Sequence, residues 1–326
     1  MQLSSLPLLV ILAILVLSIS ALLWSSDRFV SGAADIAIQL GVSPMVIGLT
    51  LVSLGTSAPE ILVSATAAID GVAELAVGNA LGSNLANTGM VLAITALLIR
   101  IPVTASTLKG EILAMLLVTL GAGAVLYNGY LGRIESILLM LAAPLFLYLS
   151  FKRGALPDPE ELIEDTGSTG ARKPLISWTV LFIGLIGLIL SSKALVSAAV
   201  ETATRAGVSE LIIGATLVAV GTSLPELAAS LTSAIKGKTD MALGNVVGSN
   251  IFNLLLVLPI AGIISPTIVS PDAFNRDFSI LMLMSLILAG VCAFGLIRNK
   301  GTSYVGRGLG LTLLIIYILY YYKIFS

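Results

Sequence analysis

Two glutamates in otherwise apolar stretches are the residues of this 326-residue chain best placed to do chemistry. Glu60 ends the hexad Gly-Thr-Ser-Ala-Pro-Glu at 55–60, and Glu226 ends the hexad Gly-Thr-Ser-Leu-Pro-Glu at 221–226, 166 positions later. A carboxylate at the centre of a bilayer costs at least about 2.5 kcal/mol, so such residues usually mark an ion pathway or a partner. The alternative is a protonated structural glutamate between helices, but two copies with the same polar neighbours favour a pathway.

A second motif follows each hexad and shows that the chain is internally duplicated. Residues 78–87 read Gly-Asn-Ala-Leu-Gly-Ser-Asn-Leu-Ala-Asn, and residues 244–253 read Gly-Asn-Val-Val-Gly-Ser-Asn-Ile-Phe-Asn. Aligning 46–94 with 212–260 without a gap gives 25 identities in 49 positions. We therefore expect two related structural units, each carrying one hexad and one Gly-Asn motif.

The spacing within the motifs predicts an oxygen-rich site. In each hexad a threonine, Thr56 or Thr222, stands four positions before the glutamate, so the two should share a helix face. Each Gly-Asn motif carries a polar stripe at i, i+4 and i+8, formed by Asn79, Ser83 and Asn87 and by Asn245, Ser249 and Asn253. A proline before each glutamate cannot donate to the carbonyl four positions earlier, so the helix should kink and leave that carbonyl free. Carboxylate, hydroxyl, amide and carbonyl oxygens suit hard cations such as Ca²⁺ or Na⁺, and not zinc or copper.

Part of each Gly-Asn motif is expected to be structural. Glycines in membrane helices allow close packing, and polar side chains form hydrogen bonds between helices. We predict close packing at Gly78, Gly82, Gly244 and Gly248, and mainly interhelical hydrogen bonds for Asn79, Asn84, Asn245 and Asn250.

The composition places the chain among polytopic helical membrane proteins. Hydrophobic residues make up 57% and charged residues 11%, and the mean hydropathy is +1.06. So few charges cannot cover a water-facing surface. Only helices or closed barrels satisfy their backbone in hydrocarbon, and the length of the apolar runs favours helices. Ten runs can span: 6–24, 44–69, 73–98, 111–127, 134–151, 175–192, 209–235, 240–263, 278–297 and 306–322.

Several functional classes are excluded. The chain has no histidine, so a Ser-His triad, an HExxH zinc site and a histidine proton relay are impossible. Ser57 and Ser223 have no catalytic partner, no GxGD motif is present, and we predict that the protein is not an enzyme and needs no cofactor. The single cysteine, Cys292, excludes an intrachain disulfide. A net charge of −1 indicates no nucleic-acid partner. The partners expected are membrane lipid and transported cations, and no protein partner is inferred.

The ten spans divide into two halves of five. The first half covers 1–151 with the repeat 46–94, and the second covers 175–326 with the repeat 212–260. The polar, acidic segment 152–174 between them is predicted to be a cytoplasmic linker and not a regulatory cation site. Because five is odd, the second half enters the membrane from the opposite side, so the fold class is an all-α membrane protein with two inverted five-helix repeats. Secondary transporters often have this arrangement, with the site at the midplane between the repeats.

The distribution of basic residues predicts the orientation. With the N-terminus outside, twelve lysines and arginines fall in cytoplasmic loops and five on the external side. Cytoplasmic loops carry the excess of positive charge, so both termini are predicted to lie outside the cytoplasm. No basic segment precedes the first apolar run, so it is predicted to be a resident span and not a cleaved signal peptide.

With ten spans and two copies of both motifs in register, the chain resembles the calcium/cation antiporter superfamily, and most nearly its prokaryotic sodium/calcium exchangers. The resemblance covers essentially the whole chain. It implies a multi-pass protein of a prokaryotic cell (inner) membrane that exchanges Ca²⁺ for Na⁺ by alternating access. The cation/proton branch carries a glutamate in its Gly-Asn motif where this chain has Ser83 and Ser249, which argues against that branch.

The resemblance also implies a ligand set and one departure from it. The implied ligands are the side chains of Glu60, Glu226, Thr56, Ser57, Thr222, Ser223, Ser83, Asn87, Ser249 and Asn253 and the backbone carbonyls of Ser53 and Ala219. The sodium/calcium exchangers generally carry an aspartate where this chain has Asn253, so this site has two acids and not three. Two carboxylates balance one Ca²⁺ or two Na⁺, whereas a third Na⁺ would add an uncompensated charge in a low dielectric.

Three transport classes follow from these observations. The first is a secondary cation antiporter exchanging Na⁺ for Ca²⁺. The alternative is exchange of Ca²⁺ for H⁺, or of another monovalent for a divalent cation, which the dependence of Ca²⁺ uptake on Na⁺ would distinguish. A cation channel could also place paired acids in a pore, but inverted repeats and proline-broken helices fit alternating access better.

Overall fold

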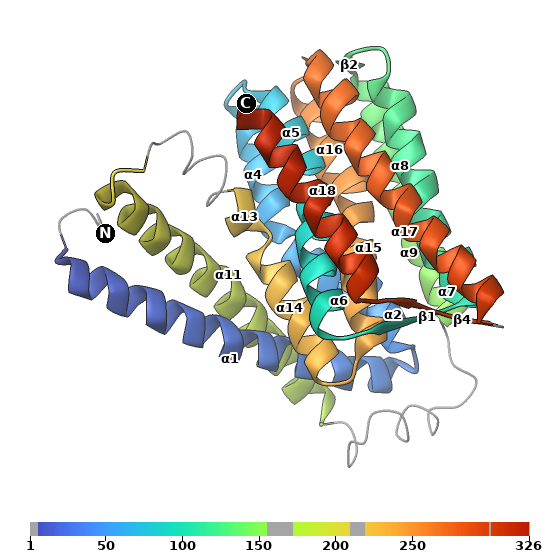
Figure 1. Cartoon of the computed structure of the whole chain (residues 1–326), viewed down its shortest axis with the longest axis horizontal. Helices are drawn as coiled ribbons and strands as arrows, with labels where there is room; N and C mark the ends of the chain where they lie inside the picture. The colour runs from blue at the N-terminus through green and yellow to red at the C-terminus, as the bar shows by residue number, and fades with distance from the viewer. Residues whose placement is uncertain (1–5, 155–171, 209–218, 300, 326) are drawn as a thin grey trace.

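The computed structural model describes residues 6–154, 172–208, 219–299 and 301–325, and it is mainly helical (Figure 1). In these residues eight helices are long and apolar enough to cross a membrane, and a bent pair makes a ninth candidate. The eight are α1 (Leu8–Leu40), α5–η3–α6 (Ala73–Ala86, Asn87–Leu92, Ala93–Leu98), α7–η4–α8 (Ala105–Thr107, Leu108–Ile112, Leu113–Leu126), α9 (Arg133–Gly154), α11 (Pro174–Arg205), α15–η6–α16 (Thr239–Phe252, Asn253–Val257, Leu258–Ile264), η7–α17 (Ala273–Phe278, Ser279–Arg298) and α18 (Arg307–Phe325).

The bent pair corresponds to the predicted span 44–69. It runs through α2 (Pro44–Ile47), η2 (Gly48–Val52) and α3 (Ser53–Thr56) to α4 (Ala58–Ile69), with a bend of 44°. The tenth predicted span, 209–235, lies partly outside the described residues, and its described part forms α13 (Ala219–Thr222) and α14 (Leu224–Ile235). The helical membrane fold is therefore established, whereas ten spans in inverted halves stay a prediction.

Two short antiparallel ribbons join connections that are distant in sequence. Strand β1 (Ile101–Thr104) pairs with β4 (Thr302–Val305), and β2 (Tyr130–Leu131) pairs with β3 (Thr267–Ile268). Each ribbon links a connection of the first half to one of the second. The ribbons lie in the connections between consecutive long helices and interrupt none of these helices.

The first and sixth predicted spans are much longer than expected, and this corrects the sequence prediction. Helix α1 has 33 residues and α11 has 32, so each is about 50 Å long at 1.5 Å per residue, against a hydrocarbon thickness of about 30 Å. The predicted runs stopped at 24 and 192 because charged residues follow, but the helices continue through those charges. As a result Asp27 and Lys193 lie well inside long helices, whereas Asp35 lies near the end of α1.

Helices α1 and α11 pack side by side along much of their length (Figure 1). Their backbones approach closely, because a Cβ added at Gly184 would lie 2.7 Å from the Cα of Phe29, and one added at Gly32 would lie 2.8 Å from the Cα of Leu181. Small residues at such points let membrane helices come together. The two long helices therefore form a pair that flanks the remaining bundle.

The two repeats form the buried centre of the molecule. In the spans Ala73–Leu98 and Thr239–Ile264, 78% of the apolar window is buried, against 22–33% in the other six long spans. Each central span follows a tight turn in which Gly71 (φ 79°) or Gly237 (φ 75°) adopts the left-handed conformation. The pairs Asp70-Gly71 and Lys236-Gly237 predict hairpin turns from the sequence, and both turns are present. They place each Gly-Asn motif beside its own hexad.

Both hexads break their helices at the serine. Ser57 has φ −82° and ψ 3° between α3 and α4, and Ser223 has φ −89° and ψ 6° between α13 and α14. In both cases the proline occupies the first turn of the new helix, where its missing N–H costs nothing. The helix break predicted from the prolines is present in both hexads, and each glutamate lies in the first turn of the new helix.

Candidate cation site

The two glutamates lie in the first turns of α4 and α14 and are removed from solvent. Glu60 is 1% exposed and Glu226 is 0% exposed. The Ser57 hydroxyl donates a hydrogen bond of 3.2 Å to Oε1 of Glu226, so the hexads of the two repeats meet directly. The carboxylates are close enough to interact electrostatically. Among the described residues, neither forms an ion pair with a lysine or arginine.

Equivalent asparagines hold the backbone of each glutamate. Asn79 Nδ2 donates to the carbonyl of Glu60 (3.1 Å) and to Ser64 Oγ (3.0 Å). Asn245 Nδ2 donates to the carbonyl of Glu226 (3.3 Å) and to Ser230 Oγ (2.8 Å). The two sets of contacts are related by the same shift of 166 positions. The interhelical role predicted for these asparagines is confirmed, and it anchors each hexad to its own Gly-Asn motif.

A second asparagine pair joins the two repeats to each other. Asn84 Nδ2 donates to the carbonyl of Asn250 (3.1 Å), and Asn250 Nδ2 donates to Thr88 Oγ1 (2.9 Å). All three side chains are buried. These bonds run between the central spans, so the predicted role of Asn84 and Asn250 in joining helices is also confirmed.

Several buried oxygens around the glutamates have no hydrogen-bond partner among the described residues. They are Oε2 of Glu60, Oε2 of Glu226, Oδ1 of Asn87, Oδ1 of Asn253, Oγ of Ser223 and Oγ of Ser249. Buried polar atoms normally have a partner, so each exception needs an explanation such as an ion. Carboxylate, amide and hydroxyl oxygens are the donor set of Ca²⁺ and Na⁺ sites. The residues present therefore fit a transported hard cation.

The polar stripes end in a local change of helix type that the sequence gave no reason to expect. At Asn87 the helix widens into the π-helical turn η3, and at Asn253 into η6. Such π-helical turns occur frequently at functional sites. No residue pattern known to us marks them in advance, and only their repetition at equivalent positions in the two halves draws attention to them.

The hydroxyl and carbonyl residues of the proposed ligand set have different surroundings. Ser53, Thr56, Ser57 and Ser83 are all buried. Ser53 Oγ donates to the carbonyl of Leu49 (2.7 Å), and the carbonyl of Ser53 accepts from the Thr56 hydroxyl (3.3 Å). In the second repeat, Thr222 is half-buried, and Ala219 begins α13 with its side chain outside the described residues.

The single continuous helix face expected for Thr56 and Glu60 is interrupted. The helix breaks at Ser57, between these two residues, so their spacing of four does not place them on a continuous turn. The Thr56 hydroxyl lies 3.2 Å from Oδ1 of Asn245, the residue whose Nδ2 donates to the carbonyl of Glu226, and Ser57 donates to the Glu226 carboxylate. The first hexad thus supports the glutamate of the second repeat.

Close packing at the motif glycines is confirmed in the second repeat. A Cβ added at Gly244 would lie 2.5 Å from the carbonyl oxygen of Met45, and one at Gly248 would lie 2.5 Å from that of Leu49. At Gly78 and Gly82 no described atom lies within 4 Å. The residues equivalent to Met45 and Leu49, 211 and 215, lie outside the described part of the chain.

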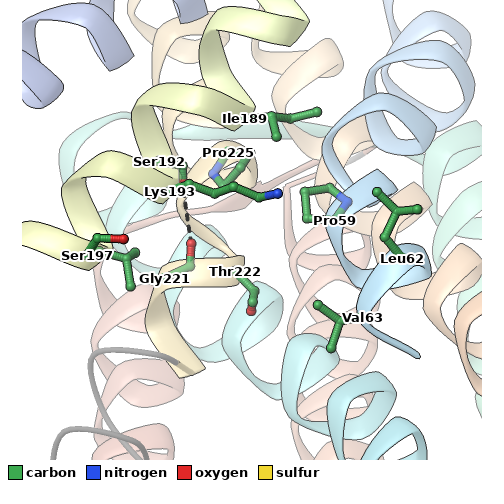
Figure 2. A pocket seen from close by; sticks show the side chains of 11 residues that line it. Pro59, Leu62, Val63, Ile189, Ser192, Lys193, Ser197, Gly221, Thr222 and Pro225 are labelled. Atoms are coloured by element: carbon green, nitrogen blue, oxygen red, sulfur yellow. Dashed lines mark hydrogen bonds between the residues drawn. The ribbon is translucent and has the colours of Figure 1, made fainter. Parts of the chain in front are cut away.

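A pocket of about 320 Å³ lies beside the hexads between α4, α11, α13 and α14 (Figure 2). Pro59, Thr222 and Pro225 form its inner end, and residues of α11 form one wall. Ser192 of α11 donates a hydrogen bond of 3.1 Å to the carbonyl of Gly221. That carbonyl is the one that Pro225 leaves without an intrahelical donor. The sequence predicted a freed carbonyl but gave no indication that Ser192 binds it.

Together the fold and the site define a helical, multi-pass membrane protein with a buried, acidic, all-oxygen site between two related repeats. The family model described as sodium/calcium exchanger protein matches residues 10–152 and 176–325, and the chain belongs to this family. It is therefore a cation antiporter, and the predicted resemblance is confirmed.

Individual relatives support the same assignment. The putative antiporter CaxA of Alkalimonas amylolytica is 45% identical over 94% of this chain and 95% of its own length. The sodium/calcium exchanger MaX1 of Methanosarcina acetivorans is 30% identical over 84% of this chain and 89% of its own. Among solved structures, the sodium-calcium exchanger NCX_Mj soaked with zero Na⁺ and Ca²⁺ superimposes with a TM-score of 0.82 at 32% identity, covering 95% of this chain and 97% of that one.

Proposed function

We propose that the protein exchanges Na⁺ for Ca²⁺ by alternating access, with both cations binding between the two hexads. The observation that carries this proposal is the set of buried oxygens without partners, contributed by equivalent positions of both repeats. A symmetric site at the junction of two inverted repeats is typical of secondary transporters. The similarity to sodium/calcium exchangers supports the choice of ions.

The proposed ligands fall into two classes. Glu60 and Glu226 supply the negative charge that a desolvated cation requires. Neutral oxygens complete the coordination, and they come from Thr56, Ser57, Thr222, Ser223, Ser83, Asn87, Ser249 and Asn253 and from the carbonyls of Ser53 and Ala219. No resident cofactor is proposed, because the cations are themselves the substrates.

Two acids set the proposed stoichiometry. The pair balances one Ca²⁺ or two Na⁺, and a third Na⁺ would leave one positive charge uncompensated in a low-dielectric site. Asn253 stands where the exchangers generally carry an aspartate, and both polar atoms of its side chain lack a hydrogen-bond partner. We therefore propose an electroneutral exchange of two Na⁺ for one Ca²⁺.

The proposed location is a prokaryotic inner membrane with both termini outside the cytoplasm. The basic residues of the loops support this orientation through their excess on the side assigned to the cytoplasm. In that orientation the pocket beside Thr222 and Lys193 opens toward the external side, so the structure would correspond to an outward-facing state.

Proton coupling is the second candidate. Two buried carboxylates that have no basic partner among the described residues can release protons when Ca²⁺ binds and take them up again when it leaves. Such a cycle would use the same site and the same movement. Only the ion that drives Ca²⁺ transport distinguishes it from Na⁺ exchange.

The test is ⁴⁵Ca²⁺ uptake into proteoliposomes with Na⁺, K⁺ and H⁺ gradients imposed separately. We expect uptake with an outward Na⁺ gradient and none with K⁺ or H⁺ alone. Uptake driven by H⁺ and indifferent to Na⁺ would replace the first candidate with the second. Single-channel conductance in planar bilayers would overturn both.

A further inference from the structure

Lys193 is a charged residue that the cation site does not explain. It lies near the middle of α11, is exposed, and lines the pocket with its amino group pointing toward Pro59 (Figure 2). Among the described residues it has no ion-pair partner. Asp70, at the end of α4, is likewise exposed and unpaired. A charge within a membrane-spanning helix is costly and usually has a function.

The internal repeat relates Lys193 to a residue that does have a partner. The shift of 166 positions extends to the long helices, where Ser25-Ser26-Asp27 of α1 corresponds to Ser191-Ser192-Lys193 of α11 (27 + 166 = 193). Asp27 pairs with Lys236 at 2.6 Å. The residue equivalent to Lys236 is Asp70 (70 + 166 = 236). The equivalent pair would therefore join Lys193 to Asp70, with the two charges exchanged.

The contacts around Asp27 show how the helices are arranged when the Asp27–Lys236 ion pair is formed. Ser26 Oγ donates to the carbonyl of Ala228 and lies 2.7 Å from Thr232 Oγ1, so α1 is closed against α14. Lys236 also donates to Ser31 Oγ at 2.7 Å. Ala228, Thr232 and Lys236 are spaced by four and present one face of α14 to α1.

Among the described residues, the equivalent contacts in the other repeat are absent, and the pocket lies in their place. Leu62 and Thr66 correspond to Ala228 and Thr232, but Ser192 donates to Gly221 instead of to Leu62. Leu62 and Ser197, the counterpart of Ser31, both line the pocket. One long helix is thus closed on its partner helix, while the other is held away from it.

We infer that Lys193 and Asp70 form an ion pair in the opposite-facing state, in which the Asp27–Lys236 pair is broken. The inference rests on the proposed alternating access, since inverted repeats exchange conformations between the two states. Closing α11 on α4 would bring Lys193 to Asp70, with the Ser197 hydroxyl placed to donate to the same carboxylate. The pocket beside Thr222 would then be closed, and the equivalent region between α1 and α14 would open.

Exchanging the charges distinguishes a pair from two unrelated surface residues. In Lys193→Asp the two acids repel, and in Asp70→Lys the two cations repel, so we expect each to slow Ca²⁺ exchange more than about tenfold. The double variant Lys193→Asp/Asp70→Lys again has one positive and one negative charge at these positions. Its rate of Ca²⁺ exchange should therefore recover to within about twofold of that of the unaltered protein. Lys173→Asp makes the same charge change at the exposed start of α11 and should have no effect. Failure of the double variant to recover would overturn the inference.

Cross-linking tests the geometry without requiring transport. In a Cys292→Ala background, the pairs Asp70→Cys/Lys193→Cys and Asp27→Cys/Lys236→Cys would be treated with a short bifunctional thiol reagent in proteoliposomes. We expect both pairs to cross-link, and we expect added Na⁺ or Ca²⁺ to raise one yield and lower the other. Cross-linking of the second pair alone under every condition would refute the inference while leaving the proposed function standing. If both pairs cross-link but the protein without a cross-link shows no Na⁺-driven ⁴⁵Ca²⁺ flux, the proposed function alone would be refuted.

Discussion

The charge count of the site predicts how transport responds to membrane voltage. Glu60 and Glu226 are buried, and neither pairs with a basic residue in the part of the chain that the structure describes. Asn253, a neutral side chain, is also fully buried. If two Na⁺ exchange for one Ca²⁺, no net charge crosses the membrane in a cycle. Replacing Asn253 by aspartate adds a third negative charge without breaking any hydrogen bond of the side chain, because neither of its polar atoms has a partner among the described residues.

The size of the effect follows from the charge moved. One elementary charge moved through 100 mV is worth about 2.3 kcal/mol, which is roughly a 50-fold change in an equilibrium ratio. Exchange of three Na⁺ for one Ca²⁺ would therefore shift the Ca²⁺ gradient at equilibrium by about 50-fold at this potential. Exchange of two Na⁺ for one Ca²⁺ would leave the Ca²⁺ gradient at equilibrium independent of voltage. The two stoichiometries are thus well separated.

The assay is the final ⁴⁵Ca²⁺ accumulation in proteoliposomes at fixed Na⁺ gradients, with K⁺ diffusion potentials set by an ionophore. We expect the unaltered protein to show no dependence on voltage. Asn253→Asp should bind Ca²⁺ more tightly and become voltage-dependent, approaching the one-charge value. Asn253→Ala, which removes the amide without adding a charge, should stay independent of voltage.

A 50-fold shift in the unaltered protein would refute the reasoning from charge balance. It would mean that a third Na⁺ binds without a third acid. An Asn253→Asp protein with unchanged Ca²⁺ affinity would show instead that this side chain is not a ligand. Transport currents after rapid Ca²⁺ addition give an independent check on both outcomes.

Three further predictions test the site and its support. Glu60→Gln or Glu226→Gln leaves one Ca²⁺ charge uncompensated, and we expect Ca²⁺ transport to fall by about 100-fold or more while size-exclusion profiles show intact protein. Gly248→Ala forces a Cβ against backbone and should lower the unfolding free energy by about 1–3 kcal/mol in thermal unfolding, whereas Gly290→Ala, in open space, should not. Asn245→Leu leaves two buried hydrogen-bond partners unsatisfied and should destabilise the protein by roughly 2–6 kcal/mol, and a change below 1 kcal/mol would contradict its anchoring role.

The sequence predicted correctly the features that depend only on residues close together in the chain. Pro59 and Pro225 predict the helix breaks because a missing N–H acts on its own turn. Gly71 and Gly237 predict the turns because few other residues tolerate their backbone conformation. The doubled glutamate within apolar sequence predicts a buried acidic site, since an isolated charge there is unfavourable.

Predictions failed where distant contacts decide the outcome. The ends of α1 and α11 were placed too early because hydropathy falls at Asp27 and Lys193, but packing between the two helices and ion pairs such as Asp27–Lys236 carry them onward. Thr56 was expected to continue the helix of Glu60, whereas the helix breaks at Ser57 and the Thr56 hydroxyl contacts Asn245 of the second repeat.

The amino-acid sequence by itself determined the membrane class, the duplication, the family and the identity of the acidic pair, because composition, spacing and backbone restrictions act through neighbouring residues. Only the tertiary structure decided which oxygens remain without partners, that Ser192 binds the carbonyl of Gly221, and that one long helix is closed on its neighbour while its counterpart stands open. These features depend on contacts between residues that are far apart in the chain. Two related repeats can adopt different contacts because packed helices have more than one stable arrangement.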